Sequence, residues 1–465
     1  DDCKFECVFV EHHLAHIASS YYSSPFDSAS AFTYDGSGDF VSGMFGHCQG
    51  QKIKIEERAY LPHSLGNFYT SICQFIGFDQ WGEEYKVMGL GAYGEPKYYE
   101  QMKKLVLWDD QLGYRLNTKY FKPLGKDYEE TVNAEGIPVM PDFFNEKFLD
   151  LMGGKKRDRK TEKISQRDMD VASSCQKIFE EVVLHNIHLL QRNHGESNLV
   201  TAGGCALNGV CNARIIRESA FEDSYIQCAA SDDGTSIGAA LYVWNEVVKG
   251  ERSPHITSAY WGPEHSDKAC EKAFNDRNVE FKEYSDEELI DQVASLLEKG
   301  LVVGWYQGRA EWGPRALGNR SIIAHPGWPD MKGIINAKIK RRESFRPFAP
   351  SILAEEVENY FEQDIKSPFM MHVVKIREDK RKALAAVCHE DYTGRLQTVA
   401  EDQNKRYYDL IKKFGEKTGT HVVLNTSFNE NEPIVDKPEH AVDCFLRTDM
   451  DALCLRNLVA IKKRN

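Results

Sequence analysis

Apolar and polar positions along this chain form short strand-like runs that alternate with longer stretches of helical spacing, a pattern typical of an α/β protein. The clearest helical stretch is residues 168–193, where apolar side chains recur every three to four positions. Further helices are predicted at 64–79, from about 209, at 239–248 and at 286–299. Strands are predicted at 5–10, 29–34, 40–46, 198–201 and 302–306.

Two of these strands, 29–34 and 40–46, are separated only by the polar turn Asp35-Gly36-Ser37-Gly38-Asp39. Gly, Asp and Ser are residues that tight turns favour, so the pair predicts a β-hairpin with this turn at its tip.

The chain has 465 residues, more than one ordinary hydrophobic core accommodates. The polar stretch 249–254 contains Gly and Pro and is typical of a linker between domains. The pattern of predicted elements changes after it. We therefore expect two domains, residues 1–252 and 253–465.

The composition excludes several classes of protein. A net charge of −13 argues against a protein that holds a nucleic-acid backbone, and no apolar run approaches the roughly 20 residues of a membrane span. The twelve cysteines include no CxxC pair, and no leader-like segment opens the chain, so free thiols are expected. These features predict a cytoplasmic protein with no membrane or nucleic-acid partner.

Two histidines form the first candidate site. His12 and His16 stand four residues apart, and on a helix this spacing places both imidazoles on one face, where they can bind one metal ion. The HExxH peptidase motif requires a glutamate where this chain has His13, so a peptidase is not favoured. Ordinary hydrogen-bonded histidines of a packed helix remain the alternative, whereas Asp232 can supply a third, carboxylate ligand.

Small residues form turns that suit phosphate binding. Gly203 and Gly204 lie between a predicted strand and a predicted helix, a geometry in which backbone amides face a phosphate. Acidic turns at 35–38 and 232–235 precede and follow them in sequence. Ordinary tight turns would show the same residues.

Cations are concentrated between positions 309 and 346 of this acidic chain. The members are Arg309, Arg315, Arg320, Lys338, Lys340, Arg341, Arg342 and Arg346. Guanidinium groups bind phosphate and carboxylate through paired hydrogen bonds, so an anionic small molecule is the expected ligand. The alternative is a set of surface arginines that pair with nearby glutamates.

Taken together, the motifs identify a family. The chain resembles the O-carbamoyltransferases of antibiotic tailoring and nodulation-factor synthesis, whose first domain is actin-like and similar to tRNA threonylcarbamoyl-transfer proteins, and whose second is similar to YrdC-type domains. The matching segments, in family order, are 12–16, 86–90, 203–208, 232–234, 313–320, 342–343, 345–350, 395–399 and 424–429.

The resemblance implies a two-step reaction. The second domain would convert carbamoyl phosphate and ATP, with Mg²⁺, into carbamoyl-adenylate, and the first would pass the carbamoyl group to a hydroxyl of a small-molecule acceptor, a natural product or a sugar. His12, His16 and Asp232 would hold iron(II) or another divalent metal. The implied catalytic cations are Arg315, Arg320, Lys340 and Arg346. The implied nucleotide and cofactor residues are Asp35, Gly36, Ser37, Gly38, Lys86, Gly203, Gly204, Asn208, Arg309, Arg342, Arg395, Thr398, Asn425, Ser427 and Asn429.

The family begins with further strands before the histidine helix, including a His-Asp turn implicated in acceptor binding. This chain starts almost at that helix, so we expect an N-terminal portion of the first domain to precede it. A homodimer is an open possibility. The other functions that the residues allow are a tRNA threonylcarbamoyl transferase, an iron oxygenase with two histidines and one carboxylate, and an inactive binding homologue.

Overall fold

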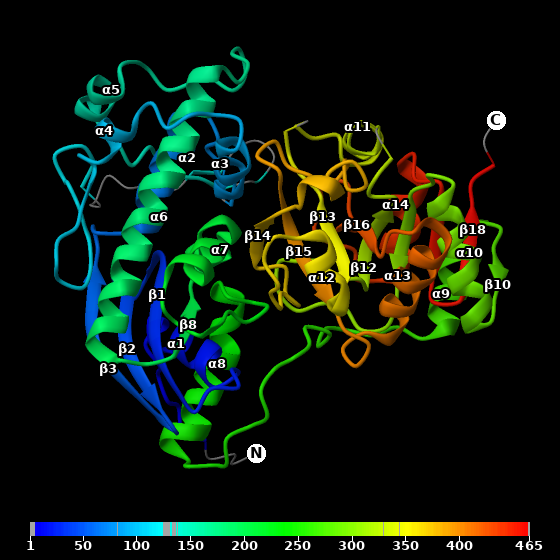
Figure 1. Ribbon diagram of the computed structural model, residues 1–465, viewed down its shortest axis with the longest axis horizontal. Helices are drawn as coiled ribbons and strands as arrows, with labels where there is room; N and C mark the ends of the chain where they lie inside the picture. The colour runs from blue at the N-terminus through cyan, green and yellow to red at the C-terminus, as the bar shows by residue number, and fades with distance from the viewer. Residues whose placement is uncertain are drawn as a thin grey trace. The chain divides into compact units, whose positions relative to one another are not determined.

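The computed structural model describes residues 5–80, 82–123, 131–132, 136, 138–328, 330–343 and 345–463. It confirms a mixed α/β protein, with two compact units, Asp1–Ile256 and Thr257–Asn465 (Figure 1). Within the described part of the chain, no helix is both long and apolar enough to cross a bilayer.

Unit 1 is built around a five-stranded sheet of order β3-β2-β1-β8-β9. The first three strands are antiparallel, whereas β1, β8 and β9 run parallel to one another. The strands are β1 (Ser28–Gly38), β2 (Val41–Gln49), β3 (Lys52–Tyr60), β8 (Asn198–Ala202) and β9 (Asp223–Tyr225). The principal helices are α1 (His12–Tyr21), α2 (Leu65–Phe75), α3 (Glu84–Gly91), α6 (Gln166–His194), α7 (Gly209–Glu218) and α8 (Thr235–Tyr242). Shorter elements are α4 (Tyr99–Met102), β4 (Val106–Leu107), β5 (Arg115–Leu116), β6 (Thr131–Val132), β7 (Pro138–Val139) and α5 (Glu146–Met152).

Helices cover both faces of this sheet. Alternate residues of β1 point to opposite faces, so the two faces can be followed from its side chains. Ala31 packs with Ile17 of α1 in one apolar cluster. On the other face the ring of Tyr34 lies 6.2 Å from that of Phe179 in α6. The sheet is thus the middle layer of three, with α1 on one side and α6 on the other (Figure 1).

Unit 2 contains a nine-stranded sheet of order β10-β18-β17-β11-β12-β16-β13-β15-β14. Its helices α10 and α13 pack together on the sheet in an apolar core around Trp305 and Phe414. The strands are β10 (Lys282–Glu283), β11 (Val303–Tyr306), β12 (Arg320–Ala324), β13 (Ala349–Leu353), β14 (His372–Lys375), β15 (Thr393–Val399), β16 (Val422–Ser427), β17 (Ala452–Leu455) and β18 (Leu458–Ile461). The helices are α9 (Asp267–Asn275), α10 (Asp286–Glu298), α11 (Met331–Ile335), α12 (Val357–Tyr360), α13 (Lys405–Thr418) and α14 (Pro438–Arg447).

Most predicted elements are present, but three differ. Residues 5–10 form no strand, because no described segment pairs with them, and Phe9 is exposed. The hairpin tip is shorter than predicted: β1 continues to Gly38, which pairs with Val41, so only Asp39 and Phe40 turn the chain. The helix expected at 239–248 begins at Thr235 and widens into a π-helical turn.

Candidate functional site

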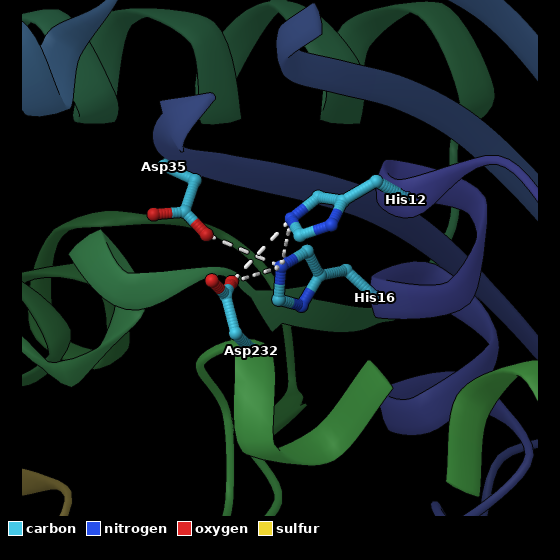
Figure 2. Close-up of side chains that lie close together, drawn as sticks. All are labelled: His12, His16, Asp35 and Asp232. Atoms are coloured by element: carbon cyan, nitrogen blue, oxygen red, sulfur yellow. Dashed lines mark hydrogen bonds and ion pairs between the residues drawn. The ribbon is translucent and has the colours of Figure 1, made fainter. Parts of the chain in front are cut away.

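Four side chains converge at the start of helix α1. The Nε2 atoms of His12 and His16 lie 3.1 Å apart, and each is 3.4 Å from Oδ1 of Asp232, which precedes α8. Oδ2 of Asp35, near the end of β1, lies 3.2 Å from His16 Nε2. One ligand atom from each residue falls within 4.8 Å of the others. Figure 2 shows the four side chains pointing toward one another. Two imidazoles and two carboxylates are a donor set that suits a divalent transition metal.

The electrostatics of this cluster favour positive charge. Burial alone would lower the pKa of His16, but its hydrogen bonds with Asp232 and Asp35 outweigh burial and raise that pKa. Hydrogen bonds from His12 and His16 hold the pKa of Asp232 well below its usual range. The Asp232 side chain is 68% exposed, so the cluster is open on one side, where a substrate atom can reach a bound ion.

The hairpin end fixes the position of His12. A Cβ on Gly38 would lie 2.1 Å from Cγ of His12, so only glycine leaves room for the imidazole. The neighbouring Asp39 accepts a hydrogen bond from the backbone N–H of His12 at 2.9 Å. The tip of the hairpin therefore holds the first turn of α1 in place.

Helices α1 and α8 touch along their backbones. A Cβ on Gly238 of α8 would lie only 1.9 Å from the carbonyl oxygen of Ala15 in α1. Helix α1 carries both histidines, and Asp232 lies just before the start of α8 at Thr235. This close contact therefore sets the spacing between the two histidines and Asp232.

His13, the third histidine of the motif, serves the scaffold. Its Nδ1 lies 2.8 Å from Oγ1 of Thr33 and its Nε2 lies 3.0 Å from the carbonyl oxygen of Val41. Burial lowers the pKa of His13 to about 4, so the ring is neutral at pH 7. His13 thus joins α1 to the sheet and turns no ring nitrogen towards the metal ligands.

The predicted glycine turn lies beside Asp35. Gly203 has a φ of 96°, and a Cβ there would lie 2.3 Å from the carbonyl oxygen of Tyr34. A Cβ on Gly204 would lie 3.0 Å from Oδ1 of Asp35. The two turns therefore meet next to the four-residue cluster, as a site for the nucleotide part of a metal-bound substrate requires.

In unit 2, several of the predicted arginines form a group of like charges. Burial lowers the pKa of Arg395 strongly, and Arg315, Arg342 and Arg346 lower it further. Burial lowers the pKa of Arg315 to about 10. Among the described residues no carboxylate pairs with Arg315 or Arg395, and the buried Nε atom of each lacks a hydrogen-bond partner. In the same group Nη1 of Arg346 lies 3.7 Å from Oε2 of Glu343. Guanidinium groups that lie close together without a carboxylate partner are groups that an anion can bind.

Lys340 lies in the same region and is also buried. Its Nζ lies 2.6 Å from the carbonyl oxygen of Ser427, 2.9 Å from that of Asn429 and 2.5 Å from Asn429 Oδ1. Burial lowers the pKa of Lys340 well below its ordinary value, and Arg342 adds to this effect. The structure thus brings together three residues that the motifs assign to one site, although they lie far apart in sequence.

Comparisons with known proteins identify the family of this chain. A family model described as "Carbamoyltransferase N-terminus" matches residues 2–241, and one described as "Carbamoyltransferase C-terminus" matches residues 294–462. The chain belongs to the carbamoyltransferase family. It is therefore an enzyme that transfers carbamoyl groups.

Several curated relatives of this carbamoyltransferase have names that indicate their roles. Nodulation protein NolNO of Sinorhizobium fredii is 37% identical over 98% of this chain and 64% of its own length. Nodulation protein NolO of Bradyrhizobium diazoefficiens is 35% identical over 98% of this chain and 79% of its own length. The 3'-hydroxymethylcephem-O-carbamoyltransferase of Amycolatopsis lactamdurans is 33% identical over 50% of this chain and 43% of its own length.

Arg320, predicted as a catalytic cation, has a different place in this carbamoyltransferase. Its two terminal nitrogens donate to the backbone carbonyls of Gln307, Asn319, Gly308 and Pro263, and its guanidinium lies 3.7 Å from the centre of the Tyr306 ring. Four of its five N–H groups are therefore used inside the protein. In this structure the Arg320 guanidinium supports the surrounding loop, and its catalytic role stays a prediction of the motifs.

Two further predicted ligand residues have partners of their own within their units. Arg309 is exposed and donates to the carbonyl oxygen of Trp261 at 3.1 Å. Lys86 is buried against Glu83, with its Nζ 2.7 Å from Oε1 of that residue. The side chain of Lys338 lies outside the described residues.

Four of the remaining predicted residues lie in strands or at the start of a helix. Asn208 caps α7 and exchanges hydrogen bonds with Gln176, and Asn425 donates to the carbonyl oxygen of Ala316 at 3.1 Å. Oγ1 of Thr398 accepts from the Ser367 N–H at 3.0 Å, and Thr398 lines a small pocket of unit 2. Ser37 is exposed.

One contribution to the metal cluster was missed. The motifs assign Asp35 to nucleotide binding, whereas its carboxylate lies among the metal-binding groups. The only signal in the sequence is that Asp35 directly follows a buried strand, a position that acidic turns and ligand residues share.

Proposed function

We propose that this carbamoyltransferase is an O-carbamoyltransferase, which makes carbamoyl-adenylate in unit 2 and transfers the carbamoyl group to a hydroxyl of a small molecule in unit 1. The observation that carries the proposal is that Arg315 and Arg395 lie among like charges, that the buried Nε atom of each lacks a hydrogen-bond partner, and that no described carboxylate pairs with either. A cluster of like charges is costly to bury without a ligand, and carbamoyl phosphate and the phosphates of ATP supply the missing negative charge.

The first step consists of a hydrolysis followed by an adenylation. Water cleaves carbamoyl phosphate into carbamate and inorganic phosphate, and a carbamate oxygen then attacks the α-phosphorus of ATP while pyrophosphate leaves. Arg315, Arg395 and Arg346 stabilise the negative charge on the phosphates, and Mg²⁺ accompanies ATP. Lys340, which already contacts Ser427 and Asn429, contributes a further positive charge.

In the second step the acceptor hydroxyl oxygen attacks the carbamoyl carbon, and AMP leaves. His12, His16, Asp35 and Asp232 would hold iron(II) or another divalent metal, which would orient the adenylate and polarise its carbonyl as a Lewis acid. The glycine turn at Gly203 and Gly204 would bind the nucleotide part through backbone N–H groups.

The named relatives support a hydroxyl acceptor. The Amycolatopsis relative is described as an O-carbamoyltransferase of a hydroxymethyl group, and two longer matches are nodulation proteins. We infer that the acceptor here is a natural product or a sugar. In the sheet of unit 1, β1, β2 and β3 are antiparallel and β1, β8 and β9 are parallel. This mixed sheet supports an actin-like first unit, and we infer a YrdC-like second unit.

The test is a coupled assay of the first step. Purified protein is incubated with ATP, Mg²⁺ and carbamoyl phosphate, and pyrophosphate and inorganic phosphate are measured together. We expect both products in equal amounts, and neither in a control that lacks carbamoyl phosphate. Absence of carbamoyl phosphate-dependent pyrophosphate would overturn the proposal. Candidate acceptors are then screened by mass for a carbamoyl increment in the presence of Fe²⁺.

A further inference from the structure

The loop that carries Arg315 connects two paired strands over a long distance. Tyr306 at the end of β11 pairs with Arg320 at the start of β12, so residues 307–319 form the connection between them. A connection of this length has no strand ladder for its own backbone groups, and their hydrogen bonds must come from elsewhere. The shape of the loop decides where the Arg315 guanidinium lies.

Glu311 supplies the acceptor for three backbone N–H groups at the end of this loop and the start of β12. Its Oε1 atom accepts from the backbone N–H of Leu317 at 2.7 Å, of Asn319 at 2.8 Å and of Arg320 at 3.2 Å. Hydrogen bonds to an ionised carboxylate are roughly twice as strong as neutral ones. One side chain thus fixes three backbone groups immediately after Arg315.

The carbonyl groups of the same stretch are also engaged. The carbonyl oxygen of Leu317 accepts from Gln397 Nε2 at 2.7 Å and from the Tyr260 hydroxyl at 2.8 Å. Arg320 fixes the carbonyls at the base of the loop, as described above. The backbone next to Arg315 is therefore held on both its donor and its acceptor sides.

The Arg315 side chain is free of such bonds. Its Nε atom is buried without a hydrogen-bond partner, and no described carboxylate pairs with it. A fixed backbone beside a free guanidinium is the arrangement of a ligand group that is held in position before its ligand arrives.

We propose that Glu311 is the positioning residue for Arg315, and that its carboxylate holds the loop in the shape that presents the guanidinium to the phosphate of carbamoyl phosphate. Glu311 acts through the backbone and does not touch the substrate. This inference rests on the proposed anion site of unit 2. Without Glu311 the loop has to be ordered by the ligand itself, so ligand binding weakens while the rate at saturation is largely kept.

The test compares E311A and E311Q with the wild type. The KM for carbamoyl phosphate in the pyrophosphate assay should rise roughly 10- to 100-fold in E311A, with kcat changed by less than about 5-fold. Gln keeps an acceptor oxygen but not the charge, so E311Q should lie between E311A and the wild type. Binding of inorganic phosphate, measured by calorimetry, should weaken in the same order.

A core variant controls for general destabilisation. Leu297 is buried in α10 and lies outside the loop 307–319, and L297A should lower Tm without changing the KM. An equal rise in KM in L297A and E311A at matched Tm would overturn the inference, as would an unchanged phosphate affinity in E311A. If E311A does not fold, the KM and the phosphate affinity of E311Q are compared with those of L297A in the same way. A wild type that binds phosphate but releases no pyrophosphate would refute the proposed function and leave the role of Glu311 testable by phosphate binding.

Discussion

The two candidate sites handle buried charge in opposite ways. In unit 1 the buried His16 has the carboxylates of Asp35 and Asp232 within 3.4 Å, so its charge is compensated by the protein itself. In unit 2 the buried guanidinium groups of Arg315 and Arg395 have no described carboxylate partner. The charges of the first site are compensated by its own carboxylates, whereas in the second site Arg315 and Arg395 lie among like charges, and the Glu343 carboxylate pairs with Arg346 of that group. The two sites should therefore respond differently to the loss of a residue.

Removal of Arg395 should give the largest effect. We expect R395A to reduce carbamoyl phosphate-dependent pyrophosphate release by about 10²- to 10³-fold, the usual result of losing one charge-stabilising donor. At the same time Tm without ligand should stay constant or rise, because an unpaired buried charge is removed. Pyrophosphate assay and calorimetry measure the two quantities.

The control for this prediction is R377A. The Arg377 side chain is 50% exposed and lies outside the arginine group, so its loss should affect neither quantity. A clear fall in Tm in R395A would show that its charge is compensated, and the contrast between the two sites would then be wrong.

Removal of His16 should affect metal binding in unit 1 without affecting the reaction in unit 2. H16A deletes a buried ligand, so affinity for Fe²⁺ or a substitute such as Co²⁺ should fall on the order of 100-fold or more. Pyrophosphate release by unit 2 should be unchanged. Metal binding is followed by titration, with H255A as control because His255 is exposed and outside the cluster. Equal metal binding in H16A and H255A would contradict the assignment of the metal site.

A smaller effect is expected from Gly38. In G38A the new Cβ would displace the His12 imidazole, from which it is separated by only 2.1 Å, so metal affinity should fall by about 10-fold. The matched control is G333A, because a Cβ on Gly333 meets no atom within 4 Å. If G38A binds metal as tightly as the wild type, the imidazole has room to move and the cluster is less fixed than the structure indicates.

The last effect concerns stability rather than binding, and involves His372 in unit 2. Burial lowers the pKa of His372 from 6.5 to about 4, so folding disfavours the protonated ring. Stability from this group is complete above pH 6.5 and is lost as the pH falls from 6.5 towards 4. We expect the wild type to lose about 2 kcal/mol by this route near pH 4.5, and H372Q to lose correspondingly less. Urea unfolding at pH 7.5 and pH 4.5 measures the difference, and identical pH slopes for the two proteins would exclude it.

The regular elements were predictable where one periodicity persisted over many residues. The apolar spacing of residues 168–193 is matched by α6, and the short runs at 198–201 and 302–306 by β8 and β11. The apolar run at 5–10 misled the prediction, because strand formation depends on a partner that a local pattern does not contain. For the same reason the hairpin turn looked longer than it is, since polar residues continue along the paired strands.

The chemistry of the sites was predictable only in part. Spacing alone places His12 and His16 together, since i and i+4 share a helix face. Arg320 and Arg315 belong to the same Gly-rich sequence, and nothing local distinguishes them. The terminal nitrogens of Arg320 donate to backbone carbonyls, whereas no described carboxylate pairs with Arg315. The roles of Asp35 and Glu311 depend on contacts across the chain that no short motif records.

The contact between Gly238 and Ala15 has a consequence for how this enzyme can diversify. Since the two helices meet backbone to backbone, any larger residue at position 238 would shift His16 relative to Asp232. During evolution or engineering the exposed loops around His12, His16 and Asp232 can vary, whereas a larger residue at position 238 would change the spacing of these three side chains. New acceptor specificity should therefore arise at the rim of the site, while the helix pair beneath it stays constant.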